Sequence, residues 1–340
     1  MNKITRILFV ILLFSQLYGA AQDVHFSMFY ASPLTLNPAL TGVVEGSYRV
    51  TAIYRNQYRS ISTPFNTYAV SFDMPLLQKQ LPNDIFGVGG LLVGDKSGDG
   101  RLSTTSGQLS ASYHKGLDKA HHHFLGVGVQ FAYTQQSIDF ANLTFPDRFN
   151  TSIENFATSP DVQAASKPNI GYFDMNAGIL QQSNFGDKVG MMTGFSVYHL
   201  AQPKESFLNQ DVRLANRYTV HEGLHIKITP KFYINPNLIY MYQDKAQEIN
   251  IGTSFEYHMG ESKSELVASL GVWYRVNDAA ILMAGLEYHK VRMMFAYDIN
   301  ASSLVPATNG RGAFELAAIF TGIIKSKAVV YPILVPCPMM

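Results

Sequence analysis

The sequence predicts an all-β fold: a transmembrane antiparallel β-barrel of about 14 strands with both termini periplasmic. Three observations predict it: an export signal at the N-terminus, the lack of a later apolar run long enough for a spanning helix, and apolar residues at every second position from residue 47 to 320. In lipid every backbone polar group needs a partner within the protein, so an exported, apolar chain without a spanning helix is expected to form a closed barrel.

Residues 1–21 have the pattern of a secretory signal peptide. Lys3 and Arg6 precede an apolar run at 7–14, and small residues at 19–21 place cleavage after Ala20 or Ala21. The alternative is a buried N-terminal helix. No Cys follows the leader, which argues against a bacterial lipoprotein. We therefore expect export to the cell outer membrane of a Gram-negative bacterium.

The composition excludes several other classes of protein. Charged residues make up 15% of the chain, against ~25% in a typical soluble domain, and hydrophobic residues make up 47%. The 26 Lys and Arg residues are balanced by 25 Asp and Glu residues, so we expect no nucleic acid partner, which would need a basic excess. The single Cys excludes an internal disulfide and any metal site built from several cysteines.

The alternation is clear in the first predicted strand. Tyr48, Val50, Ala52 and Tyr54 fall on one face, and Arg49, Thr51, Arg55 and Gln57 fall on the other, with Ile53 as an inward-facing exception. Across the chain, one face is apolar with Tyr near the segment ends, and the other is Gly, Ser, Asn, Gln, Arg and Glu. A soluble β-sandwich also alternates, but such a polar face would make a poor sandwich core and suits a lumen.

The predicted strands lie near 47–58, 65–74, 85–94, 104–114, 123–133, 171–181, 188–198, 217–228, 231–242, 248–258, 264–275, 279–289, 291–299 and 312–320. The strand at 85–94 is apolar or Gly on both faces. With the N-terminus in the periplasm, the long connections 134–170, 199–216 and 300–311 fall outside, and the periplasmic turns are mostly short, as expected of outer-membrane barrels.

The predicted organisation has three parts after the leader. Residues 22–46 form a periplasmic N-terminal segment that could plug the lumen, 47–320 form the barrel, and 321–340 form a periplasmic tail. A barrel of this width is expected to hold water, an inward loop, the N-terminal segment or a bound peptide. Pro38 excludes the helical conformation at Asn37 and so predicts an extended or turned chain there.

Inward-facing charges offer two interpretations. The basic residues are Arg49, Arg55, Arg59, Arg275 and Arg292, directed inward or to a rim, and the acidic residues able to pair with them are Glu256, Glu287, Asp298 and Glu315. They can form a salt-bridge network that stiffens the barrel, or a polar surface that holds a peptide. We assign no binding site, and Asn37, Pro38, Arg55 and Arg275 are the first targets for mutation.

The sequence predicts no enzyme, and we assign no catalytic, cofactor or metal-binding residues. His121-His122-His123 alternate faces on a strand and so cannot chelate from one side. The Asp95–Gly100 stretch lacks the spacing of a calcium loop and suits a turn. There is no Gly-x-Ser-x-Gly motif, and His221 and His225 on one strand face would lie about 13 Å apart. Cys337 is either a packed thiol in the tail or a link to a partner.

An ordered series of short motifs resembles one family. The series is Gln22-Asp23-Val24-His25-Phe26-Ser27, Ser32-Pro33-Leu34, Leu36-Asn37-Pro38-Ala39-Leu40-Thr41-Gly42, Tyr54-Arg55-Asn56-Gln57-Tyr58, Val70-Ser71-Phe72-Asp73-Met74-Pro75-Leu76, Gly87-Val88-Gly89, Gly194-Phe195-Ser196, Tyr198-His199-Leu200, Tyr274-Arg275-Val276-Asn277-Asp278-Ala279, Tyr297-Asp298 and Cys337-Pro338. It resembles the PorP/SprF family of type IX secretion system outer-membrane proteins over essentially the whole mature chain. Tyr58, where many relatives have Trp, and the apolar tail at 331–335 depart from the pattern.

The resemblance implies a role in protein secretion and gliding motility, without catalysis. The implied partners are a secreted surface adhesin or its C-terminal domain, periplasmic ring components of the secretion machine, and outer-membrane lipid. The alternative from the barrel physics alone is a porin-like channel for small solutes.

Overall fold

The structure, a computed structural model, describes residues 23–61, 63–98, 100–139, 149–150, 155–156, 169–207, 211–259 and 266–324. The predicted signal peptide, much of the connection at 134–170 and the tail that carries Cys337 lie outside these ranges.

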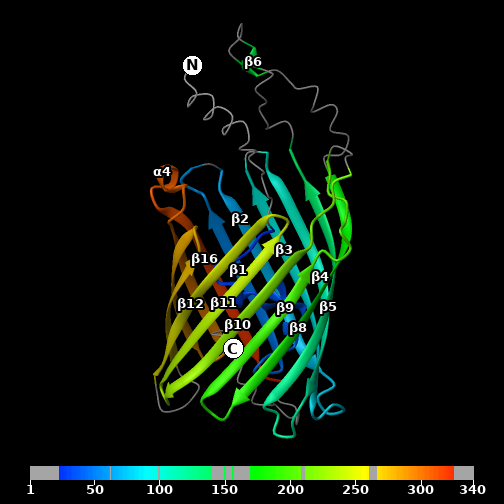
Figure 1. The fold of residues 1–340 in the computed structure, drawn as a ribbon, viewed down its shortest axis with the longest axis vertical. Helices are drawn as coiled ribbons and strands as arrows, with labels where there is room; N and C mark the ends of the chain where they lie inside the picture. The colour runs from blue at the N-terminus through cyan, green and yellow to red at the C-terminus, as the bar shows by residue number, and fades with distance from the viewer. Residues whose placement is uncertain are drawn as a thin grey trace, which may run out of the picture.

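Fourteen antiparallel strands form one closed barrel, as predicted (Figure 1). They are β1 (Tyr48–Gln57), β2 (Phe65–Leu76), β3 (Asp84–Ser97), β4 (Leu102–Gly116), β5 (His123–Ser137), β8 (Asn169–Phe185), β9 (Val189–Tyr198), β10 (Arg217–Thr229), β11 (Phe232–Gln243), β12 (Ala246–Met259), β13 (Leu266–Arg275), β14 (Ala279–Tyr288), β15 (Val291–Asn300) and β16 (Arg311–Gly322). Each pairs with the next of these strands, and β1 pairs with β16 from Tyr48↔Gly322 to Gln57↔Ala313, which closes the cylinder. A separate pair, β6 (Phe149–Asn150) and β7 (Asn155–Phe156), lies outside the barrel.

The predicted alternation sets which side chains face the lumen. On β5, Leu125 and Phe131 are 50% and 61% exposed on the outer face. Gln130, which directly precedes Phe131 on the same strand, is fully buried on the inner face. Strands β3, β4, β5 and β8 are longer than predicted because backbone pairing continues beyond the apolar band, for example at Lys96↔Ser103 and Thr104↔Gln136. Polar residues there carry no alternation of hydrophobicity, so the sequence pattern ends before the strand does.

The two rims of the barrel differ. The long-loop rim carries the connections 58–64, 98–101, 138–168, 199–216, 244–245, 276–278 and 301–310, the last of which includes the short helix α4 (Val305–Thr308). The hairpin rim carries 77–83, 117–122, 186–188, 230–231, 260–265 and 289–290. All three long connections expected from the sequence lie on one rim. Within the described residues, no helix combines the length and apolar character needed to cross a membrane.

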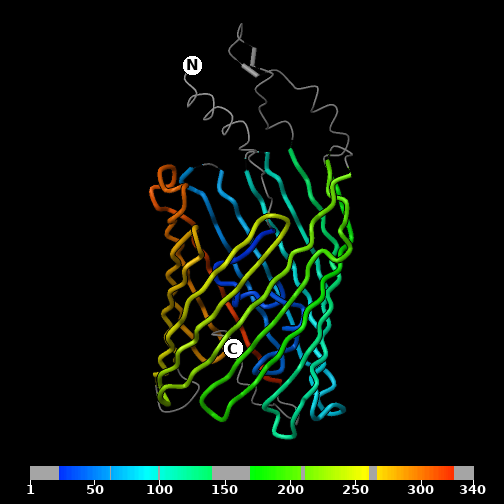
Figure 2. The backbone as a smooth tube through the Cα atoms, viewed as in Figure 1, coloured from blue at the N-terminus to red at the C-terminus, as the bar shows by residue number. Residues whose placement is uncertain are grey.

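Residues 23–46, here called the N-terminal segment, run through the lumen (Figure 2). Three short helical turns shape the segment: η1 (Phe29–Ala31), α2 (Pro33–Leu36) and η2 (Pro38–Leu40). Residues 26–44 are buried except for Thr35. Asp23 contacts Gln243 at the long-loop rim, and Ser47 pairs with Gly322 at the hairpin rim. The segment therefore crosses from rim to rim.

This path changes the expected placement of the chain ends. The sequence pattern predicts both termini on one side of the barrel, but the described ends, Asp23 and Ile324, lie at opposite rims. The reason is that the segment enters the lumen at one rim and reaches the start of β1 at the other.

Candidate functional site

Asn37 is the central anchor of the N-terminal segment. Its backbone is extended ahead of Pro38, and its side-chain Oδ1 accepts a hydrogen bond from the amide of Ala39 at 2.9 Å, which caps η2. The side-chain Nδ2 donates to the carbonyl oxygen of Ile179 on β8 at 3.0 Å and lies 3.2 Å from Nε2 of His221 on β10. One buried amide therefore ties the segment to two strands of the wall.

Glycines in the wall make this close approach possible. A Cβ at Gly178 would lie 1.9 Å from Oδ1 of Asn37, and a Cβ at Gly128 on β5 would lie 2.4 Å from the backbone of Pro38 and Ala39. Real Cβ atoms do not approach other atoms so closely. The wall is therefore shaped to the segment at these two positions.

Arg49 and Asp73 form a second anchor, on β1 and β2. Nε and Nη2 of Arg49 donate to the two carboxylate oxygens of Asp73 at 2.9 and 2.8 Å, a bidentate pair that is almost fully buried. Asp73 Oδ2 also accepts from the amide of Gly42 at 2.8 Å, and Arg49 Nη2 donates to the carbonyl of Leu40 at 3.2 Å. The pair thus fixes the end of the segment. Asp73 is not among the acidic residues that the sequence pattern predicts as partners for the arginines.

The third anchor is a four-charge cluster around Ser27: Arg55, Arg275, Asp298 and Glu315. Glu315 accepts hydrogen bonds from the amides of Ser27 at 2.6 Å and Met28 at 2.8 Å. The Ser27 hydroxyl donates to Asp298 at 2.7 Å and accepts from Arg55 and Arg275 at 2.5 and 3.1 Å.

The same cluster is bound together by its own ion pairs. Arg55 pairs with Glu315 at 2.5 Å and with Asp298 at 3.1 Å, and Arg275 pairs with Asp298 at 2.6 Å. Two cations and two anions balance, which is the condition for burying charge at tolerable cost. The network joins β1, β13, β15 and β16 to one another and contacts the protein's own N-terminal segment at Ser27 and Met28.

The remaining predicted charges are distributed between the rims. Arg292 pairs with Glu256 at 3.3 Å and with Glu287 near the hairpin rim. Arg59 follows β1 and is exposed at the long-loop rim.

Apolar packing fills the space between the polar anchors. The ring of Tyr30 lies 5.2 Å from that of Trp273 on β13, and both side chains are buried. Inward-facing apolar residues of the wall belong to the same buried core as the segment: Ile53, Leu91, Ile239, Ile281, Met283 and Met294. This explains why Ile53 breaks the polar pattern of the inner face, since it faces the segment and not water.

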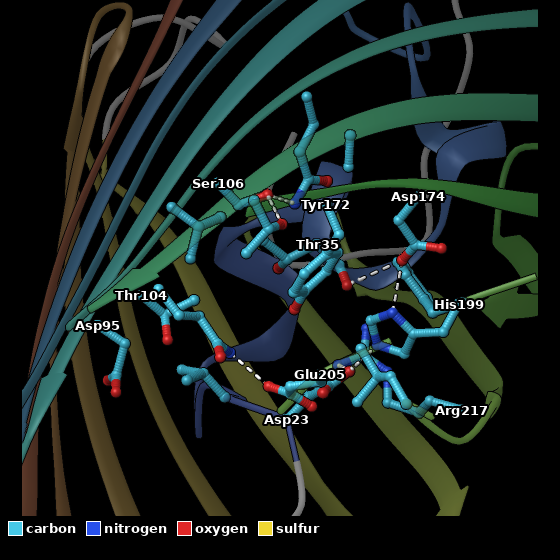
Figure 3. A pocket seen from close by; sticks show the side chains of 18 of the residues that line it. Asp23, Thr35, Asp95, Thr104, Ser106, Tyr172, Asp174, His199, Glu205 and Arg217 are labelled. Atoms are coloured by element: carbon cyan, nitrogen blue, oxygen red, sulfur yellow. Dashed lines mark hydrogen bonds and ion pairs between the residues drawn. The ribbon is translucent and has the colours of Figure 1, made fainter. Parts of the chain in front are cut away.

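At the long-loop rim, Asp23 tethers the start of the segment (Figure 3). Its carboxylate lies 2.5 Å from Nε2 of His199 and 3.2 Å from Arg217, and it accepts from Gln243 at 3.1 Å. Burial alone would lower the pKa of His199, but hydrogen bonds to Asp174 and Asp23 raise that pKa to about 9. Burial would raise the pKa of Asp23, but the charge of Arg217 and the hydrogen bond to His199 hold it well below its usual value. The tether is therefore a charged pair at neutral pH.

A cavity of about 310 Å³ opens beside this tether. Its charged side chains include the acids Asp23, Asp95, Asp174 and Glu205 and the bases His199 and Arg217 (Figure 3). Tyr172, Thr104 and Ser106 add hydroxyl groups, and Val24, Phe26 and Leu214 add apolar surface. The acids outnumber the bases, so the cavity favours a positively charged guest.

The other motifs considered in the sequence are structural where they are described. His121 lies in a turn of the hairpin rim, and Asp118 accepts hydrogen bonds from the amides of His122 and His123. Gly98 has a positive φ in the turn after β3. Within the described part of the chain, no three His, Cys, Asp or Glu side chains are grouped to hold a metal ion.

Comparison with known proteins assigns the family. The family model described as type IX secretion system membrane protein PorP/SprF matches residues 18–320. The chain belongs to the PorP/SprF family. The motifs quoted above lie almost entirely inside the matched range, and PorP/SprF membership together with the barrel supports an outer-membrane location. No curated protein matches the chain.

Solved structures similar to this PorP/SprF protein share its barrel fold. The toluene transporter TbuX of Ralstonia pickettii matches with a TM-score of 0.52 and 9% identity, over 88% of this chain and 95% of that chain. A FadL homologue of Pseudomonas aeruginosa matches with a TM-score of 0.50 and 10% identity, over 84% of this chain and 92% of that chain. At this identity the likeness concerns the fold alone.

Proposed function

We propose that this protein is an accessory barrel of type IX secretion that binds a secreted surface protein at its long-loop rim. The partner is an adhesin-type protein, engaged through its C-terminal domain, and the rim faces the cell exterior. Periplasmic ring components of the machine are the second class of partner, met at the hairpin rim. The chain performs no catalysis.

The observation that carries this proposal is the occupied lumen. Between the rims, the N-terminal segment fills the barrel with buried residues from 26 to 44, apart from Thr35. A general solute channel needs a continuous water path, and a segment held by three sets of buried polar contacts obstructs one. A filled barrel suits a binding role better than the porin alternative.

The acidic cavity supplies a specific contact for the partner. Asp95 and Glu205 face it from β3 and from the 199–216 connection, so they can receive a Lys or Arg side chain of an incoming segment. A charge pair formed in such a half-enclosed site contributes both to association rate and to specificity. Cleavage of the leader after Ala20 or Ala21 would leave one or two residues ahead of Asp23, which lines the same cavity.

A binding experiment tests the proposal. The purified barrel in detergent is titrated with the C-terminal domain of a type IX surface adhesin encoded in the same genome. We expect Asp95→Asn with Glu205→Gln to weaken binding by about tenfold or more, as for a lost interfacial charge pair. The matched control is Asp118→Asn at the hairpin rim, which removes an acid without altering the cavity. Equal affinity of both variants, or no binding by the native barrel, would refute the proposed mode.

Conductance distinguishes the alternative function. In planar bilayers we expect the native barrel to show no large, steady open pore. A stable conductance typical of a wide channel, together with no adhesin binding, would establish the porin-like function in place of the accessory role.

A further inference from the structure

Glu222 is an acidic residue on the outer face of the barrel wall. On β10 the outer and inner faces are well separated: Val220 is 41% exposed on the outer face, whereas His221 is 4% exposed on the inner face. Glu222 shares the outer face with Val220 and Leu224. Its carboxyl group therefore points to the side that faces lipid.

The position of Glu222 along the strand places it inside the apolar band. Tyr218 and Ile228 are exposed on the same face. At about 3.3 Å per residue they lie roughly 13 Å and 20 Å away along the strand in opposite directions. Other outward-facing charged residues of the described strands, such as Asp84, Lys96 and Lys115, lie at a strand end or one residue from it. Ionisable groups at the depth of Glu222 are costly in lipid.

Polar side chains on the neighbouring strands β9 and β8 lie beside Glu222 on the outer face of the wall. Register pairs Gln181 on β8 with Thr193 on β9, and Thr193 with Glu222 on β10. The Thr193 hydroxyl donates a hydrogen bond to the Glu222 carboxylate. Three adjacent strands therefore present a polar row across a wall that is otherwise apolar.

The backbone beside this row is also irregular. The ladder between β10 and β11 pairs Gly223 with Asn237 and Ile226 with Ile234, but no pair lies between them. Pro236 stands in this gap, and it has no N–H to donate to the ladder. A proline inside a wall strand leaves a backbone acceptor without its usual partner, which adds a second polar feature next to Glu222.

We propose that this face of the wall, formed by Gln181, Thr193, Glu222 and Pro236, is an interface for a second integral outer-membrane protein. The partner presents a Lys or Arg side chain from its own lipid-facing surface at the depth of Glu222. Pairing with a cation offsets the cost of the carboxylate in lipid, and the Thr193 and Gln181 side chains give the contact its register.

Charge and depth argue for this occupant over two others. Lipid headgroups lie at the membrane surface, whereas the row lies within the apolar band. A second copy of this chain offers no complementary cation at this depth, because the outward-facing Lys96 and Lys115 each lie one residue from the end of their strand. Two copies joined through this face would bring carboxylate against carboxylate.

Photo-crosslinking in native outer membranes tests the proposal. A benzophenone amino acid is placed at Val220, next to Glu222, and in a separate protein at Leu282, an equally lipid-facing position on β14. We expect the Val220 probe to yield an adduct whose crosslinked peptide belongs to an integral outer-membrane protein and maps near an outward-facing Lys or Arg. The Leu282 probe should give no such adduct.

Variants separate the charge from the fold. Glu222→Leu should lower the Val220 adduct at least about fivefold, and Glu222→Gln should also lower it, because the proposed pair needs a charge. Heat-dependent gel mobility verifies that each variant forms a folded barrel. Adducts to lipid alone, adducts between two copies of this chain, or an undiminished yield in Glu222→Leu would overturn the proposal.

Discussion

Ala39 and Gly128 meet so closely that a Cβ at position 128 would lie 2.4 Å from the backbone nitrogen of Ala39. Gly128 belongs to β5, and Ala39 belongs to the N-terminal segment, 89 positions earlier in the sequence. The segment and the wall can coexist in this arrangement only while position 128 has no side chain.

Replacing Gly128 with Val should therefore displace the segment. The barrel strands themselves tolerate Val, which favours β structure. We expect the Gly128→Val protein to remain a folded barrel but to show open-pore events in planar bilayers. Gly90→Val is the control, since a Cβ there meets neighbours no closer than 3.8 Å. A folded Gly128→Val barrel as silent as the control would contradict the close-fit interpretation.

Asn37→Ala should lower the free energy of unfolding. The change leaves the Ile179 carbonyl and the Ala39 amide without a side-chain partner in a buried site, at a cost of about 1–3 kcal/mol. Denaturant unfolding of the barrel in detergent, followed by tryptophan fluorescence, measures the change. Thr35→Val on the same segment, at a partly exposed position, is the comparison and should cost less. Equal losses would show that Asn37 is not a special anchor.

The cluster around Ser27 should respond to charge balance. Arg55→Met leaves Glu315 and Asp298 short of a cation in a buried site, so we expect a loss of about 3–5 kcal/mol in unfolding free energy. Arg55→Met combined with Glu315→Gln restores neutrality and should be more stable than the sum of the two single changes. Strict additivity of the two losses would mean that the residues act independently.

The tether of Asp23 to His199 should depend on pH. The pKa of His199 rises from its usual 6.5 to about 9. The stability that protonated His199 contributes is therefore fully present below pH 6.5 and is lost as pH rises through 9. The pKa of Asp23 is depressed, so the stability that its carboxylate contributes is present above pH 3.8 and is lost as the pH falls below that value. The tether is therefore strongest between about pH 4 and 6.5 and weakens toward alkaline pH.

A spin label measures this effect at the start of the segment. In a Cys337→Ser background, a label on Val24→Cys should become more mobile between pH 7 and 10. His199→Asn should remove most of that pH dependence, and a label at the exposed Leu304 should not follow it. The same mobility change with and without His199 would assign the titration to another group.

The alternation predicted the wall because it depends on neighbours two residues apart. Tyr68, Val70 and Phe72 face lipid on β2 as the pattern requires, and Ser71 between them is buried inside. The contents of the lumen depend on contacts between distant residues, such as Asn37 with His221, which no local period reveals. The signals in the sequence that point to a filled lumen are the apolar residues and glycines on an inner face that is otherwise polar. Ile53 and the glycine-rich inner face of 85–94 mark where the segment packs.

Because residues 23–46 precede β1 and yet lie within the finished cylinder, they restrict the order of assembly. The pairing between β1 and β16 closes the ring, and it joins the first strand of the barrel to the last one. Either the strands assemble around an N-terminal segment that is already in position, or the partly apolar segment must enter the lumen of a barrel that is already closed. The first route buries Tyr30 and Leu34 as the wall forms, so the N-terminal segment would act as a template during membrane insertion.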